Sequence, residues 1–149
     1  MINDNLKLRG DVAIVLKDKN GNVKESREIN NLVVTAGLTF ICSRMAGASA
    51  GVMSHMALGS STTAAAAGQT DLVSILGSRE VLDSSTASAN TIVYVSSFEA
   101  GEGTGAVTEA GVFNASSSGT MLCRTVFPVV NKGTDDTMSV TWTITLTAS

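Results

Sequence analysis

The sequence predicts a mainly β protein: an antiparallel β-sandwich or jelly-roll-like barrel with one short helix near residues 36–46. From residue 79 onward, five strand-like segments follow one another at intervals of roughly 10–15 residues, separated by short polar or glycine-rich turns. The last of these segments alternates between apolar and hydroxyl side chains. Near the N-terminus, Asn20-Gly21 separates two further strand-like segments, and this dipeptide is the strongest short signal for a hairpin.

The N-terminal hairpin spans residues 1–30 of a single domain, 1–149, because a chain of 149 residues suits one domain. Residues 11–18, DVAIVLKD, are apolar on both faces in their middle, which predicts a strand inside a sheet. Residues 22–29, NVKESREI, carry many charges and predict an edge or solvated strand. The hairpin either folds on its own subunit or extends as an arm onto a neighbouring subunit; the residues favour neither.

The expected helix follows this hairpin. Thr35 can cap its first turn, and Gly47 supplies the stop. Four apolar residues recur at the spacing of one helical face, which we expect to pack into the core: Leu38, Ile41, Cys42 and Met45. Residues 47–71 are then mostly Gly, Ala, Ser and Thr around one apolar island, VMSHMALG, and predict a loop. This loop either lies flat on a neighbouring surface or is disordered.

The C-terminal half supplies the remaining strands: REVLDSST, TIVYVSSFEA, GAVTEAGVFN, TMLCRTVFPVV and MSVTWTITL. In the last one, the apolar side chains that point one way into the core are Met138, Val140, Trp142, Ile144 and Leu146. The other face is uncharged Ser and Thr, which suits packing against a second chain. The single proline, Pro128, is expected where a strand ends or lies at an edge.

Composition excludes two classes of partner. The formal net charge is −3, only 15% of the residues are charged, and Lys and Arg are scattered, so we expect neither nucleic acid nor an anionic membrane as partner. A surface of Ser, Thr, Ala and Gly suggests cover by other protein chains, with a soluble monomer as the alternative. Cys42 and Cys123 are expected to be reduced, buried small residues. Neither a signal peptide nor a run of ~20 apolar residues is evident, so the protein is expected to be made in a cytoplasm.

A glycine cluster at residues 101–106 has the form of a dinucleotide-binding fingerprint, G-x-G-x-x-A. That fingerprint needs a helix directly after it and an acidic residue ~20 positions further on. Here a β-prone segment follows, and position 121 is Met. Gly101, Gly103 and Gly105 are therefore expected to form a turn between two strands, with no cofactor.

Other candidate chemistry is weak. His55 is the only histidine, so it cannot build a His-rich metal site, and no G-x-S-x-G elbow accompanies it. Asp135-Asp136 lie in a turn, where aspartates usually form local hydrogen bonds. We therefore expect no catalytic residues, no metal site and no enzymatic activity.

Glu109 is the exception, because it lies in an otherwise apolar strand. A carboxylate buried alone is costly, so Glu109 must be exposed or paired. We expect a structural ion pair with Arg124 or Arg79. Glu109, Arg124, the three glycines and Trp142 are the structural candidates of this sequence.

Several motifs together resemble a family of small structural proteins of tailed bacteriophage virions. They are NLVVTAGLTFICSRMAG, MALGSST, GTGAVTEAGVFNASSSGTMLCRTVF, the lysine of VVNKG and SVTWTIT, which cover about residues 30–146. Members are described as capsid cement or decoration proteins, as tail-fibre proteins or as structural proteins, and the same motif order resembles the N-terminal module of larger tail-fibre proteins.

The resemblance implies a β-rich virion protein without catalytic residues that works by docking, as a homotrimer on the major capsid protein. We expect a cement protein on the outer capsid surface that binds the assembled shell and bridges its subunits. A component of the tail or tail fibre is the alternative.

Overall fold

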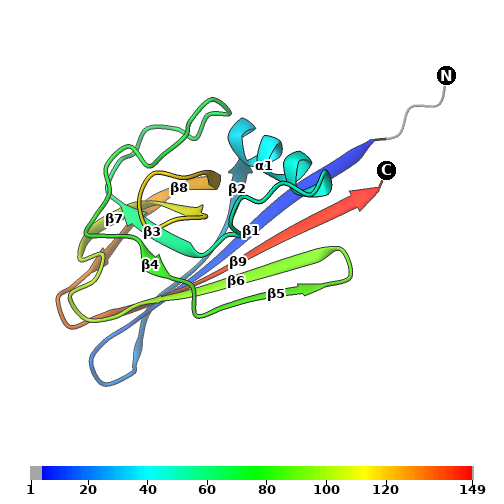
Figure 1. The fold of residues 1–149 in the computed structure, drawn as a ribbon. Coiled ribbons are helices and arrows are strands. Elements are labelled where there is room, and N and C mark those ends of the chain that lie inside the picture. The colour runs from blue at the N-terminus through cyan, green and yellow to red at the C-terminus, as the bar shows by residue number, and fades with distance from the viewer. Residues whose placement is uncertain (1–4, 149) are drawn as a thin grey trace.

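The computed structural model describes residues 5–148, which contain one helix and nine strands (Figure 1). Strand residues make up 53% of the described residues and helical residues 8%. The elements are β1 (Leu6–Lys17), β2 (Val23–Val33), α1 (Thr35–Met45), β3 (His55–Gly59), β4 (Glu80–Val81), β5 (Ser84–Ser88), β6 (Thr91–Phe98), β7 (Gly105–Phe113), β8 (Met121–Lys132) and β9 (Thr137–Ala148).

The nine strands form one antiparallel sheet in the order β4-β3-β7-β8-β2-β1-β9-β6-β5. The sheet curls into a half-barrel, so the predicted mainly β, sandwich-like or barrel-like fold is confirmed. Its two edge strands, β4 and β5, are consecutive in the chain, and they meet at one corner. There the Leu82 N–H donates to the Ser54 carbonyl at 2.9 Å, and the Asp83 N–H donates to the Val95 carbonyl at 2.7 Å.

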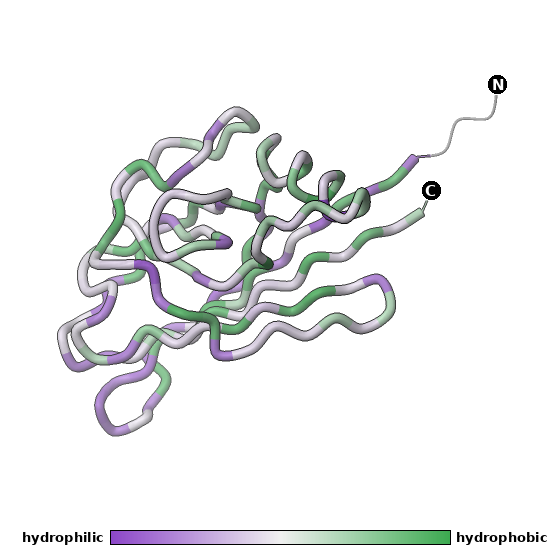
Figure 2. Tube along the Cα trace, in the orientation of Figure 1, coloured by the Kyte–Doolittle hydropathy of each residue, from purple (hydrophilic) through white to green (hydrophobic). Residues whose placement is uncertain are grey.

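The predicted N-terminal hairpin is present, with Gly21 in the turn at φ 82°. As expected, β1 lies inside the sheet, between β2 and β9. Figure 2 shows hydrophilic residues at the tip of this hairpin and alternating hydropathy along the C-terminal strand. The partner of β2 on its other side is β8, which pairs with it only at Leu32 and Val33. Beyond that point the Arg27 guanidinium bridges the two strands, donating to the Pro128 carbonyl at 3.3 Å.

The helix forms where it was expected, but two details of the prediction are wrong. The residue at its N-cap is Val34, which makes no side-chain capping bond, and Thr35 is the first helical residue. The predicted buried face is also wrong in three of its four residues: Leu38 is 46% exposed, Met45 is 83% exposed and Cys42 is exposed.

Gly37 explains which face of α1 turns inward. It is the buried residue of the helix, and a Cβ atom on it would lie 2.1 Å from the Leu122 carbonyl oxygen of β8. The helix therefore rests on the β8 backbone at the one position that lacks a side chain, and Phe40 and Ile41 pack against the core. Hydrophobic spacing alone does not reveal a close approach of this kind, which depends on the neighbouring strand.

β3 is a strand that the sequence analysis assigned to a loop. Met56, Ala57 and Leu58 are all fully buried, because β3 pairs with β7 on one side and has core on both faces. Met56 and Leu58 belong to the main apolar cluster, and Ala57 belongs to a smaller one. A short strand buried on both faces shows a continuous apolar run rather than alternation, so its period gives no signal.

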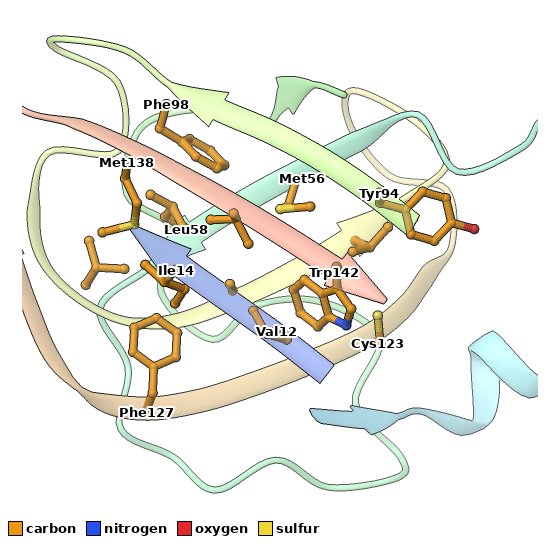
Figure 3. Close-up of a cluster of buried hydrophobic side chains, with 14 of the residues drawn as sticks. Val12, Ile14, Met56, Leu58, Tyr94, Phe98, Cys123, Phe127, Met138 and Trp142 are labelled. Atoms are coloured by element: carbon orange, nitrogen blue, oxygen red, sulfur yellow. The ribbon is translucent and has the colours of Figure 1, made fainter. Parts of the chain in front are cut away.

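The core lies inside the curl of the sheet (Figure 3). As predicted, Met138, Val140, Trp142 and Ile144 of β9 point into it, and Leu146 is partly buried. Trp142 is paired with Val12 of β1 across the two strands, and both belong to the main apolar cluster together with Cys123 (Figure 3). Few aromatic residues are available, so aliphatic and methionine side chains fill most of this core.

Candidate functional site

The glycine cluster forms a turn between β6 and β7. Gly101, Gly103 and Gly105 have φ values of 86°, 59° and 139°, which other residues adopt only with strain. A Cβ atom on Gly103 would lie 2.7 Å from a methyl carbon of Leu58. Strand β7 begins at Gly105 itself, where a dinucleotide-binding loop would need the start of a helix. The glycines thus serve the turn and its packing on β3.

His55 and the Asp135-Asp136 turn, the residues considered for catalysis or metal binding, lie in different elements of the fold. The His55 Nδ1 atom lies 2.8 Å from the Ser54 hydroxyl, its neighbour in the chain. Asp135 lies in the β8–β9 turn on another part of the sheet. Within residues 5–148, no group of three or more His, Cys, Asp or Glu side chains is arranged to hold a metal ion. In the same range, no helix has the length and hydropathy that a membrane crossing needs.

Glu109 and Arg124 form an ion pair in which both side chains are completely buried. Glu109 lies on β7 and Arg124 on β8, where the residue paired with Arg124 is Gly111. The Arg124 Nε donates to the Glu109 Oε2 atom at 2.9 Å, and the Nη2 atom lies 2.8 Å from the same oxygen. Of the two partners expected for Glu109, the structure therefore brings Arg124 to it.

Arg79, the other expected partner, is used elsewhere. Its guanidinium donates to the carbonyl oxygens of Ala115 and Ser118 at 2.9 and 2.8 Å, and stacks 3.7 Å above the centre of the Phe113 ring. Arg79 thus stabilises the β7–β8 turn.

Three backbone N–H groups of a single loop complete the surroundings of the Glu109 carboxylate. The Oε1 atom accepts hydrogen bonds from the Ser74 and Ser61 N–H groups at 2.8 and 3.3 Å, and the Oε2 atom accepts one from Val73 at 3.2 Å. Both carboxylate oxygens are therefore occupied by donors. In this state Glu109 organises backbone and is not free to act as a base or a nucleophile.

Arg124 extends the same network to the middle of the loop. Its Nη1 atom donates to the Gln69 Oε1 atom at 3.0 Å. The same amide oxygen accepts the Ala66 N–H at 2.9 Å, and the Gln69 Nε2 atom donates to the Ala64 carbonyl at 3.3 Å. We call residues 60–74 the clamped loop, because the buried ion pair and Gln69 fix it at its two ends and in its middle. The low-complexity segment was expected either to lie on a neighbouring surface or to be disordered. The structure gives it a defined conformation, which excludes disorder, and its contact with a neighbouring surface stays a prediction.

Gly59 makes room for the carboxylate. It lies directly opposite Glu109 in the β3–β7 pairing, and a Cβ atom on it would lie 2.5 Å from the Glu109 Oε1 atom and 2.6 Å from the Ser74 carbonyl oxygen. Sequence reasoning missed Gly59, Gln69 and the three backbone donors. A buried charge in β7 signals that partners exist, but the loop that supplies them lies 35 to 48 positions away along the chain.

A further buried charge, Lys132, contacts the backbone beside the glycine turn. The Lys132 Nζ atom donates to the carbonyl oxygens of Glu99 and Asp136 at 2.8 and 2.7 Å. Desolvation lowers the pKa of Lys132. Lys24 donates to the Asp136 carboxylate at 2.8 Å, and this hydrogen bond, together with one from the Gly133 N–H, lowers the pKa of Asp136. These contacts tie β2, the glycine turn and the β8–β9 turn together.

The remaining structural candidates and the cysteines have simple surroundings. Trp142 is fully buried, and its ring N–H has no hydrogen-bond partner among residues 5–148. Cys123 is buried as expected, and burial raises the pKa of its thiol. Cys42, expected to be buried, is instead exposed on α1 because of the orientation that Gly37 imposes.

Comparisons with protein-family models, with curated proteins and with solved structures give no match to this chain.

Proposed function

We propose that this chain is a bacteriophage capsid cement, or decoration, protein. It binds the assembled shell, as a homotrimer, on the outer surface of the virion and bridges neighbouring subunits of the major capsid protein. The proposal starts from the resemblance of residues 30–146 to small virion structural proteins, and the surface of the molecule supports it.

The observation that carries the proposal is the clamped loop. Residues 60–70 contain no charged side chain, and residues 62–68 are exposed except for the half-buried Ala65. Burying an ion pair requires desolvation of two charges, and such a pair contributes most where it fixes a specific geometry. Here it holds a small, uncharged surface in one shape. A pre-ordered, charge-poor surface suits docking on another protein because little conformational entropy is lost on binding.

The mechanism is thermodynamic. A protein that contacts several subunits of the assembled shell binds that state and not the free subunits, and it stabilises the shell by mass action. A trimer adds multivalency, because three linked weak contacts act at a high effective concentration. The mechanism requires no catalytic group of this chain, and the role of Glu109 within it is to position backbone.

Copy number in purified virions tests the proposal. A cement protein is expected in hundreds of copies per particle on a stained gel, and particles that lack it should lose infectivity at a lower temperature than complete particles. About three to eighteen copies, with an effect on adsorption and none on heat stability of the head, would instead support the tail component, in line with the multiplicities of symmetric oligomers.

A further inference from the structure

A groove of about 540 Å³ opens between α1 and the last strands of the sheet. β9 lies between α1 and β6 in Figure 1 and provides the floor of the groove with Leu146. Phe40, Met45 and Val52 line one wall, and Ile92 and Tyr94 of β6 line the other. We call this surface the α1–β5 groove. Met45 and Val52 are 83% and 61% exposed, so much of its apolar lining faces solvent.

The second wall of the groove ends at an unprotected strand edge. β5, residues Ser84–Ser88, pairs with β6 on one side and is the last strand of the sheet on the other. All five of its residues are exposed. Proteins usually protect such an edge with charges, a proline or a bulge, and the sequence SSTAS contains no charge and no proline. This edge can accept a further strand.

The geometry of the β5–β6 hairpin shows which backbone groups are free. Ser88 pairs with Thr91 across a two-residue turn, so these two residues exchange hydrogen bonds, and bonded and non-bonded pairs alternate from there. The N–H and C=O groups of Ser85 and Ala87 therefore point away from β6. The side chains of the same two residues line the α1–β5 groove. The free backbone groups and the apolar surface thus face the same site.

We propose that the α1–β5 groove and the free edge of β5 together bind an extended segment of another protein chain. The segment adds a strand to β5, and its apolar side chains, at alternate positions, enter the groove. This is the mode of recognition in which main-chain hydrogen bonds supply affinity and side-chain pockets supply specificity.

The nearly uncharged lining of the groove restricts which residues can occupy the middle of the bound segment. Among the residues that the structure describes, Arg44 is the one charged residue that lines the groove, and its guanidinium already donates to the carbonyl oxygens of Ala48 and Ala50 at 3.1 and 2.8 Å. A charge on the segment would therefore be desolvated without a partner. The central part of the segment must be uncharged.

A second copy of β5 does not suit this groove. In a symmetric pair of β5 strands, each copy would offer the other only the small side chains of serine, threonine and alanine. These are too short to fill a groove of this size, so pairing of this kind would leave it open. We therefore assign the segment to a different protein, in which branched or aromatic residues stand at alternate positions. If the proposed function holds, a subunit of the shell supplies it.

Binding of a synthetic peptide tests the proposal. The probe is a fluorescent peptide with valine or isoleucine at alternate positions, threonine between them and one lysine at each end; fluorescence anisotropy follows its binding to the purified full chain. We expect saturable binding. A peptide with serine in place of the aliphatic residues, and one with N-methyl groups on alternate backbone nitrogens, should each bind at least about tenfold more weakly.

Two variants with matched controls locate the site. Ala87→Pro removes an outward N–H, and Met45→Glu places a carboxylate in the groove; each should weaken binding at least about tenfold. Ala87→Ser keeps the N–H, and Val23→Glu changes an apolar residue, 59% exposed, at the distant hairpin turn; both should bind within about twofold of the native chain. Circular dichroism checks that each variant is folded. If Ala87→Pro does not fold, Met45→Glu and the N-methylated peptide still decide the outcome.

The proposal is wrong if the native chain does not bind the peptide, or if the N-methylated peptide or Met45→Glu leaves binding unchanged. It is also wrong if the native chain self-associates in sedimentation and Met45→Glu abolishes that association, because the groove then serves a second copy. Peptide binding and virion copy number are independent measurements, so this inference and the proposed function can fail separately.

Discussion

Glu109 shows how a single buried charge organises its surroundings. Its carboxylate accepts three backbone hydrogen bonds and pairs with Arg124, and both side chains of the pair are completely buried. The sequence alone predicted that this residue has a partner, since an unpaired carboxylate in an apolar strand is too costly. The loop that is clamped could not be predicted in this way, because its residues 60–70 carry no charge and the segment has no periodic pattern.

Replacing Glu109 by Gln should therefore lower the free energy of unfolding strongly. The variant leaves the Arg124 guanidinium buried without a counter-charge, which costs about 3–5 kcal/mol of unfolding free energy. For a chain of this length, the melting temperature falls by roughly 2–4 °C for each kcal/mol. Urea denaturation followed by circular dichroism measures the change.

Asp11→Asn is the matched control, because it removes one partner of an exposed pair. The Arg9 and Asp11 side chains are 73% and 41% exposed, so this change should cost less than about 1 kcal/mol. Equal losses of unfolding free energy for Glu109→Gln and Asp11→Asn would show that the buried Glu109 pair contributes no more to stability than an exposed pair.

The lowered pKa of Asp136 predicts that the stability of the fold depends on pH. The hydrogen bond from Lys24 lowers its pKa in the folded state, so its contribution to stability is present above the ordinary value of 3.8 and is lost as the pH falls through the lower folded pKa. The difference in unfolding free energy between the native chain and Asp136→Asn should thus be largest near neutral pH. It should shrink below pH 3.8, which denaturation curves at several pH values can follow. A difference that stays constant would contradict this role of Asp136.

At the scale of the elements, α1 illustrates both what periodicity predicts and where it stops. The helix itself was predicted from the spacing of its apolar residues and from Gly47 as its end, and it forms at Thr35–Met45. Its buried side was mispredicted, because the decisive residue is Gly37, which has no side chain and therefore no place in a hydrophobic pattern. β3 was missed for a related reason, since its continuous apolar run has no period.

Gly37→Ala tests the contact between α1 and β8. Alanine favours a helix over glycine by about 1 kcal/mol, but its Cβ would lie 2.1 Å from a backbone oxygen that cannot move aside. We expect a net loss of about 1–3 kcal/mol in unfolding free energy, typical of overpacking. Gly68→Ala in the clamped loop meets nothing within 4 Å and should be neutral or slightly stabilising. If Gly37→Ala were as stable as Gly68→Ala, the helix would not rest on β8 as described.

At the scale of the whole molecule, the class of the fold follows from the sequence, but the order of its strands does not. Alternation, turns and the Asn20-Gly21 hairpin predict antiparallel strands, and these are local features. The pairing of β1 with β9, and the brief pairing of β2 with β8, join segments that are far apart in the chain. Nothing local in either segment specifies such a partner.

The low charge of the surface predicts how the proposed shell binding responds to salt. Contacts made by uncharged residues, such as residues 60–70 of the clamped loop, lose little to screening, so affinity for the shell should change less than tenfold between about 50 and 200 mM salt. Sedimentation of particles with added protein measures the bound fraction at each concentration. A fall of tenfold or more would indicate that charged contacts dominate.

The place of β1 and β9 in the sheet also has a consequence for synthesis and folding. Lys17 pairs with Thr137 and Leu6 with Ala148, so the central seam joins the two ends of the described chain (Figure 1). During synthesis β1 is made well before β9, so one side of β1 stays unpaired until β9 has been made. Non-local pairing of this kind is associated with folding in milliseconds to seconds rather than microseconds. During that interval the edge of β1 that will pair with β9 is open, and this is the stage at which the chain is most prone to aggregate.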